Sequence, residues 1–339
     1  MLSVETSSYQ RTERMEVFMK QCSPCFNPPD KGEVFFTDGS PPEHPSSDAV
    51  YNEMNRLAGK YTCVKLSEFG KSVMGKPLLK ICAGCGKRKV LYSASHHANE
   101  WITTLVLLKF MNELFEMSRI NGRIGAFNAK DLLNRTTLCF IPLINPDGVD
   151  LVLEKNSSEK YFEQAKKIAG DYPSIPFPLG WKANIEGTDL NLQYPANWEK
   201  AKQIKFDLGF VSPAPRDYVG TAPLSAPESR ALANFTQNFN PDIVVALHSQ
   251  GNVIYWKFAN YETWGAYELG LKLAAVSGYE LSQTPPESDN AGYKDWFIQD
   301  FGRPGYTVEM GLGESPLPLS QFGTIYAEVA PLLATAANG

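Results

Sequence analysis

Short apolar runs alternate along the chain with longer apolar or amphipathic stretches. The short apolar runs predict buried strands over residues 88–95, 136–144, 242–248 and 305–311. The longer stretches predict helices over residues 101–117, 227–239, 261–278 and 319–338. Strands that are apolar on both sides and alternate with helices favour an α/β fold, with a mixed, mostly parallel central β-sheet flanked by helices on both faces.

The N-terminal part has a different pattern. Residues 22–48 are rich in Pro, Gly and Ser, which predicts a loop-rich N-terminal extension over residues 1–48. Residues 49–339 show neither an internal repeat nor a central linker. We therefore expect one domain there, which carries the chemistry.

Composition and charge then narrow the class of protein. Hydrophobic residues make up 43% of the chain and charged residues 20%, as in ordinary globular proteins. The net charge of −5 comes without long basic runs, which argues against a nucleic-acid partner. We see no signal-peptide pattern and no run of about 18 apolar residues, so we expect no membrane partner and a cytoplasmic location. The oligomeric state is left open.

Histidines mark the candidate chemistry. The chain has four of them, namely His44, His96, His97 and His248. Three stand at the ends of predicted strands, where α/β folds place their functional residues. His97 and Glu100 flank a strand-to-helix turn that can aim both side chains at one point, and His248 can supply a third ligand. Two His and one Glu with an open fourth position suit catalytic Zn²⁺. We interpret His96 as a neighbour of the site and not as a ligand.

Several motifs carry a resemblance to a known family. They are His-Ala-Asn-Glu-Trp (97–101), Gly-Thr-Asp-Leu-Asn (187–191), Leu-His-Ser-Gln (247–250) and Tyr-Thr-Val-Glu (306–309). In this order they resemble the zinc carboxypeptidase family, over about residues 50–335. The resemblance implies a zinc metallopeptidase with one catalytic ion held by His97, Glu100 and His248.

The same resemblance implies roles for three further residues. Glu309 matches the general base, which takes a proton from water and delivers it to the leaving amine. Lys182 stands where the family has an arginine beside the oxyanion. A lysine ammonium is a point charge and cannot bind through two parallel hydrogen bonds as a guanidinium does. Asp189 resembles the carboxylate that orients a ligand histidine, here His97.

One motif departs from the family pattern. Carboxypeptidases read Asp-Leu-Asn-Arg-Asn, where Asn and Arg grip the terminal carboxylate of the substrate. This chain keeps Asn191 but has Leu192 in place of the arginine. In this region it looks most like bacterial γ-D-glutamyl-meso-diaminopimelate peptidases, which cut murein peptides. The resemblance thus implies a peptide substrate with free carboxylates, for which Lys294 and Arg303 are candidate partners.

Alternative interpretations stay open at each of these points. The histidines could be hydrogen-bonded residues at strand ends, with Glu100 a first-turn carboxylate favoured by the helix dipole. The function could be that of an ordinary carboxypeptidase, a small-amide hydrolase, or a non-catalytic metal- or peptide-binding module.

The six cysteines raise a separate alternative. Because disulfide frameworks belong mainly to small secreted proteins, we expect reduced thiols, with Cys82 in a core strand. The pairs Cys22/Cys25 and Cys82/Cys85 could instead hold a second, structural zinc ion, which we favour less.

Overall fold

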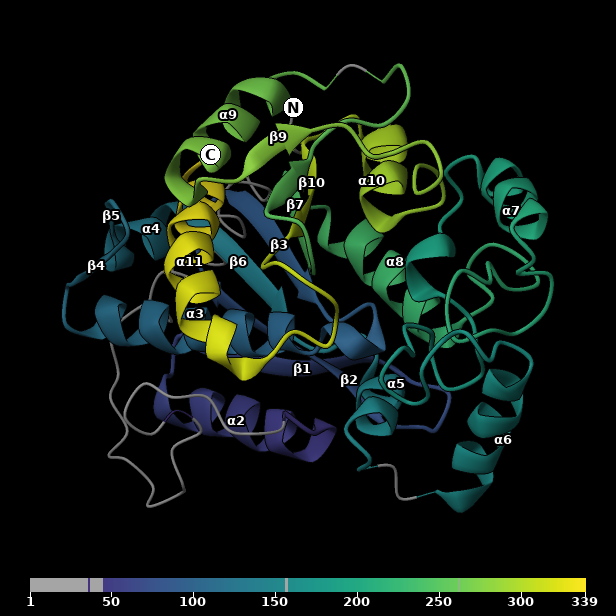
Figure 1. Cartoon of the computed structure of the whole chain (residues 1–339). Helices are drawn as coiled ribbons and strands as arrows, with labels where there is room; N and C mark the ends of the chain where they lie inside the picture. The colour runs from purple at the N-terminus through teal and green to yellow at the C-terminus, as the bar shows by residue number, and fades with distance from the viewer. Residues whose placement is uncertain (1–35, 37–44, 156–157, 262) are drawn as a thin grey trace, which may run out of the picture.

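The computed structural model describes Phe36 and residues 45–155, 158–261 and 263–339. Its centre is an eight-stranded sheet with the order β1-β2-β6-β3-β7-β10-β8-β9 (Figure 1). The strands of this sheet are β1 (Val64–Lys71), β2 (Pro77–Gly84), β3 (Arg88–Ala94), β6 (Thr136–Ile141), β7 (Ile243–His248), β8 (Val253–Tyr255), β9 (Glu280–Ser282) and β10 (Gly305–Glu309). A separate hairpin pairs β4 (Arg123–Ile124) with β5 (Phe127–Asn128).

Helices and short 3-10 turns connect these strands. They are α2 (Ser47–Lys60), η2 (Ala98–Glu100), α3 (Ile102–Arg119), α4 (Ala129–Arg135), α5 (Pro146–Val152), α6 (Glu159–Gly170), η3 (Leu190–Leu192), α7 (Trp198–Asp207), α8 (Pro227–Phe239), α9 (Ala266–Ser277), α10 (Tyr293–Phe301), η4 (Leu319–Gln321) and α11 (Phe322–Asn338). Within the described residues, none of these helices is long and apolar enough to cross a membrane.

The sheet is mixed, as predicted. Its four inner strands β6, β3, β7 and β10 are all parallel to one another. Antiparallel pairs add β1 and β2 at one edge and β8 at the other. Because the inner strands share a direction, their carboxyl ends meet along one edge of the sheet, which is where α/β proteins carry ligands.

Successive side chains of the inner strands pack into two separate hydrophobic cores, one on each face of the sheet. Val90 and Tyr92 of β3 point into a large core that also contains side chains of α2, α3 and α11. Leu91 of β3 points the other way, into a core shared with α8 and α10. Figure 1 shows α3 and α11 on one side of the sheet and α8 and α10 on the other. Burial on both faces explains why these strands are apolar without alternation.

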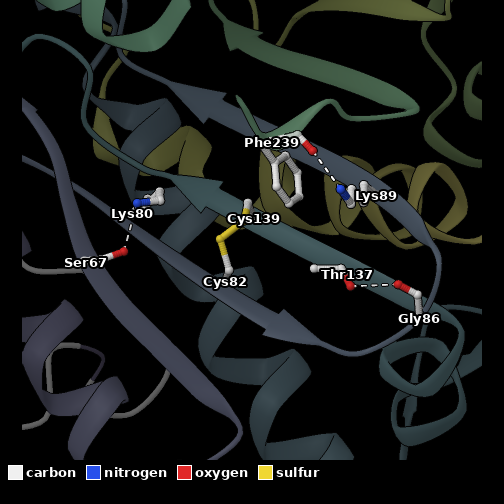
Figure 2. Close-up of a disulfide and its surroundings, with 8 residues drawn as sticks. All are labelled: Ser67, Lys80, Cys82, Gly86, Lys89, Thr137, Cys139 and Phe239. Carbon is white, nitrogen blue, oxygen red and sulfur yellow. Dashed lines mark hydrogen bonds between the residues drawn. A yellow bond between two sulfur atoms is a disulfide. The ribbon is translucent and has the colours of Figure 1, made fainter. Parts of the chain in front are cut away.

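The expectation of reduced thiols is wrong for one pair of cysteines. Cys82 does lie in a core strand, β2, but it forms a disulfide with Cys139 of β6 (Figure 2). The two residues are 57 positions apart, and the antiparallel pairing of β2 with β6 sets them directly opposite each other. Cys82 therefore offers no thiolate to a four-cysteine zinc site. Cys85 is a free thiol, and Cys22 and Cys25 lie outside the described residues.

Most of the predicted N-terminal extension lies outside the described residues, but its boundary can be compared with the fold. Helix α2 begins at Ser47, whose hydroxyl donates a hydrogen bond to Asp150 at 2.5 Å. Phe36 packs in the large core, where its ring stacks on Phe322. Part of residues 1–48 thus contacts the domain itself.

A buried carboxylate joins α8 to the hairpin between β1 and β2. Glu228 accepts a hydrogen bond from the Val73 amide at 3.0 Å and one from Asn184 Nδ2 at 3.3 Å. Burial raises the pKa of Glu228 to about 7, and the Val73 amide opposes this rise only in part. Between pH 4.5 and about 7, Glu228 is therefore protonated in the folded protein but ionised in the unfolded chain.

This proton predicts a pH-dependent stability. As pH rises from about 4.5 to about 7, the folded state should lose about 3 kcal/mol relative to a Glu228→Gln variant, which is neutral at every pH. Thermal unfolding of both proteins across this range measures the difference. The exposed Glu163→Gln variant is the control and should track the wild type. A difference between Glu228→Gln and wild type that does not change with pH would contradict the prediction.

Candidate active site

Three predicted site residues lie where neighbouring parallel strands end. His97 follows β3, His248 is the last residue of β7, and Glu309 is the last residue of β10. The register sets Glu309 beside His248. Glu100 closes the 3-10 turn η2 that links β3 to α3. The parallel arrangement thus brings residues from three distant segments to one place.

The three predicted metal ligands converge. His97 Nδ1 lies 2.9 Å from Glu100 Oε1, and His248 Nδ1 lies 3.0 Å from Glu100 Oε2. The two imidazole Nδ1 atoms are 3.3 Å apart. Burial opposes a charged imidazolium, but Glu100 and Asp189 outweigh it and raise the pKa of His97 to about 9. Two imidazoles and a carboxylate facing one another are the donor set that Zn²⁺ takes in catalytic sites.

Asp189 prepares His97 for a metal. Its Oδ1 lies 3.2 Å from His97 Nε2 and also accepts the Asn191 amide, while its Oδ2 accepts the Asp217 amide. Burial disfavours the charge on Asp189, but His97 outweighs burial and holds the pKa of this carboxyl below its usual range. A bound metal would displace the Nδ1 proton of His97, and the proton left on Nε2 would be directed to Asp189. The residues present therefore fit a zinc ion.

His96 lies outside this donor set, as we expected from the sequence. Its buried ring stacks on that of His248, with centroids 5.4 Å apart. Its Nε2 lies 3.4 Å from the Tyr194 hydroxyl. Burial lowers the pKa of His96 well below its usual value, which keeps this imidazole neutral in the core.

Glu309 and Lys182 flank the converging donors. Both line the same cleft as His97 and Glu100, which has a volume of about 240 Å³. Lys182 Nζ donates to Glu100 Oε1 at 2.9 Å. Withdrawal from bulk water raises the pKa of Glu309, and His248 opposes this rise. A carboxylate with a raised pKa beside a metal site suits proton transfer near neutral pH.

Two of the three predicted substrate-binding residues lie in the cleft, and the third, Arg303, does not. Asn191 and Lys294 both line the cleft. Asn191 Oδ1 accepts the Tyr293 amide at 3.0 Å, and no hydrogen bond joins its amide nitrogen to another residue in the described part of the chain. Lys294 is only 4% exposed and donates to Asp295 Oδ1 at 2.5 Å and to the Lys257 carbonyl at 2.7 Å. Its charge is thus already matched by a neighbouring acid.

The interpretation of Arg303 as a substrate-binding residue needs correction. Its guanidinium donates to Asn240 Oδ1 at 2.8 Å and to the Pro241 carbonyl at 2.7 Å, and it does not line the cleft. Arg303 precedes β10, whereas Glu309 ends it. Six residues of sequence therefore place the two side chains at opposite ends of an extended strand.

The sequence interpretation missed Arg216. This residue lines the cleft together with Lys205 and Asp217. The segment that carries it has no helix or strand. The Pro215 carbonyl accepts hydrogen bonds from the Lys182 and Ala183 amides, which holds this segment at the site. Arg216 lies outside the family motifs quoted above, so the sequence interpretation had no signal for it.

The fold and the site together define a metal-dependent hydrolase of the α/β class. The model of the zinc carboxypeptidase family matches residues 50–330, and the chain belongs to this family. It is therefore a zinc metallopeptidase, which confirms the resemblance seen in the sequence.

Individual relatives are consistent with this assignment. The chain is 43% identical to gamma-D-glutamyl-L-diamino acid endopeptidase 1 of Lysinibacillus sphaericus, over 82% of this chain and 68% of the relative. It is 38% identical to the protein YqgT of Bacillus subtilis (strain 168), over 84% of this chain and 75% of the relative. The crystal structure of carboxypeptidase A from Helicoverpa armigera matches with a TM-score of 0.64 at 18% identity, covering 100% of this chain and 83% of that one. At this identity the last comparison shows the fold alone.

Proposed function

We propose that this enzyme hydrolyses murein-derived peptides at the γ-D-glutamyl-meso-diaminopimelate bond. The observation that carries the proposal is the 43% identity to an endopeptidase named for γ-D-glutamyl-diamino acid bonds. The cleft supports it. Leu192, at the position of the family's carboxylate-binding arginine, is 8% exposed and packs in a small apolar cluster with Trp198 and Val219. The enzyme therefore lacks the fork with which carboxypeptidases bind a terminal carboxylate.

The chain's own residues supply the steps of the reaction. Bound zinc would polarise the scissile carbonyl and lower the pKa of a water molecule toward about 7. Glu309 takes the proton of the attacking water and delivers it to the leaving amine. Lys182 supplies positive charge beside the oxyanion that forms on the carbonyl. Asp189 keeps His97 in the orientation that the metal requires.

Incubation with L-Ala-γ-D-Glu-meso-diaminopimelate tests this proposal. The zinc-loaded enzyme should release diaminopimelate, detected by mass spectrometry. A panel of ordinary peptides with free and blocked C-termini runs in parallel. Release of C-terminal residues from these peptides, with no cleavage of the murein peptide, would favour an ordinary carboxypeptidase instead.

Lys182 offers a test of the oxyanion role. Lys182→Met should lower kcat about 10²- to 10³-fold, because a fixed charge is removed from the place where the oxyanion develops. Lys182→Arg should restore much of the rate. Zinc content, measured on the same samples, should stay unchanged. If kcat also stays unchanged in Lys182→Met, the assignment of Lys182 fails.

The predicted cytoplasmic location is also a proposal, and the Cys82–Cys139 disulfide argues against it. Structural disulfides persist mainly in oxidising compartments. Rapid alkylation of intact cells followed by mass spectrometry decides the question. Alkylated Cys82 and Cys139 would support the cytoplasm, and an intact disulfide would contradict it.

A further inference from the structure

A second hollow adjoins the active-site cleft. It has a volume of about 560 Å³ and shares Lys182, Arg216 and Gln250 with the cleft. Segments 174–180 and 314–316 provide most of its remaining wall. Lys294 and Glu309 line only the first cleft. A substrate that spans both spaces therefore passes Lys182 and Arg216 on its way out of the metal site.

Arg216 is held firmly at this junction. Its Nε donates to Asp217 Oδ2 at 2.6 Å, and Lys205 Nζ donates to Asp217 Oδ1 at 2.6 Å. The Asp217 amide donates to Asp189 Oδ2 at 3.1 Å. Asp189 in turn orients His97, so a continuous chain of hydrogen bonds fixes Arg216 relative to the metal donors.

Arg216 is also the cation of the cleft that remains open to a ligand. Lys182 is paired with Glu100, Lys205 with Asp217 and Lys294 with Asp295. The Arg216 side chain is 44% exposed, and its two terminal nitrogens donate to no residue in the described part of the chain. These nitrogens can therefore bind a carboxylate through two parallel hydrogen bonds.

A γ-linked glutamyl residue carries a carboxylate on the acyl side of the scissile bond. Its side-chain carbonyl forms that bond, so its α-carboxylate stays free, separated from the carbonyl by the α carbon and two methylene groups. A glutamyl residue whose α-carboxyl is converted to the amide keeps the same scissile bond but has no such carboxylate. We propose that Arg216 binds the α-carboxylate of the γ-linked glutamyl residue and thereby selects substrates in which this carboxylate is free. This inference rests on the proposed function.

A pair of substrates tests the role of Arg216. The first is L-Ala-γ-D-Glu-meso-diaminopimelate, and the second is the same peptide with the α-carboxyl of glutamate converted to the amide. Wild-type enzyme should prefer the acid in kcat/KM by about 10- to 100-fold, the range for a charge-assisted hydrogen-bonded pair. Arg216→Gln should lose this preference by slowing hydrolysis of the acid and leaving that of the amide nearly unchanged. Arg216→Lys should restore part of it.

Arg303→Gln is the matched control, because Arg303 lies away from both hollows, and it should keep the preference for the acid. A purely structural role for Arg216 would slow both peptides equally in Arg216→Gln, which would overturn the inference. If wild type cleaves acid and amide equally well, the inference also falls while the proposed function stands. If wild type cleaves neither peptide, both fall.

Discussion

Glu309→Gln is expected to lower kcat by about 10²- to 10⁴-fold, the range for loss of a general base. Glutamine has nearly the same shape but cannot accept the proton of the attacking water. Glu309 is not among the three converging donors, so the variant should keep its metal. Steady-state kinetics on the murein peptide, with zinc measured by atomic absorption, gives both quantities on one preparation.

Two further variants make this result interpretable. Glu309→Asp keeps the carboxylate but shortens the side chain, and it should recover part of the lost rate. Glu314→Gln removes a carboxylate from the neighbouring hollow and should leave kcat within a few fold of the wild type. A Glu309→Gln enzyme with full zinc and full kcat would show that another group takes the proton.

The metal site could be predicted from the sequence because its residues stand at the ends of strongly apolar strands. All six residues of β7, Ile243–His248, are buried, and such a run is easily recognised. The order of parallel strands then brings His248 close to His97. The sequence alone does not show this neighbourhood, and the family resemblance supplied it. The helix predicted over residues 227–239 coincides with α8.

The edge of the sheet was harder to predict. All residues of strand β1 except Val64 are partly or fully exposed, and the strand carries charges along its length, so its sequence lacks a continuous apolar run. The Cys82–Cys139 bond depends on the register between β2 and β6, which long-range pairing determines. The expectation of reduced thiols rested on chain length and cellular compartment, and neither of these determines the register between two strands.

The residues of the cleft also differ in how well the sequence predicts them, depending on whether they lie on a strand or in an irregular segment. Arg216 reaches the site through backbone hydrogen bonds of an irregular segment, for which no periodicity exists. Arg303 looked suitable only because it is close to Glu309 in sequence. Distance along an extended strand grows by about 3.3 Å per residue, so closeness in sequence there means separation in space. Strand ends are therefore predictable from apolar runs, whereas Lys182 and Asp189 in irregular segments were found only through the family resemblance.

His248→Ala should remove the catalytic zinc. The variant leaves two donors, His97 Nδ1 and Glu100, of the three that converge. Loss of a residue that merely orients a zinc ligand weakens binding about 10- to 100-fold, so loss of a ligand itself should weaken it by more than about 100-fold. After dialysis against a weak chelator, zinc content should fall from about one equivalent to nearly none, with loss of peptide hydrolysis.

His96→Gln and Asp189→Asn are the controls for zinc loss from His248→Ala. His96 is adjacent to a ligand but contributes no donor, so His96→Gln should retain about one equivalent of zinc under the same dialysis. Asp189→Asn disturbs only the orientation of His97, and its zinc affinity should fall between those of wild type and His248→Ala. Full zinc retention by His248→Ala would refute the assigned ligand set. Zinc loss from His96→Gln, with the fold intact by circular dichroism, would show that the neighbouring histidine had been wrongly excluded.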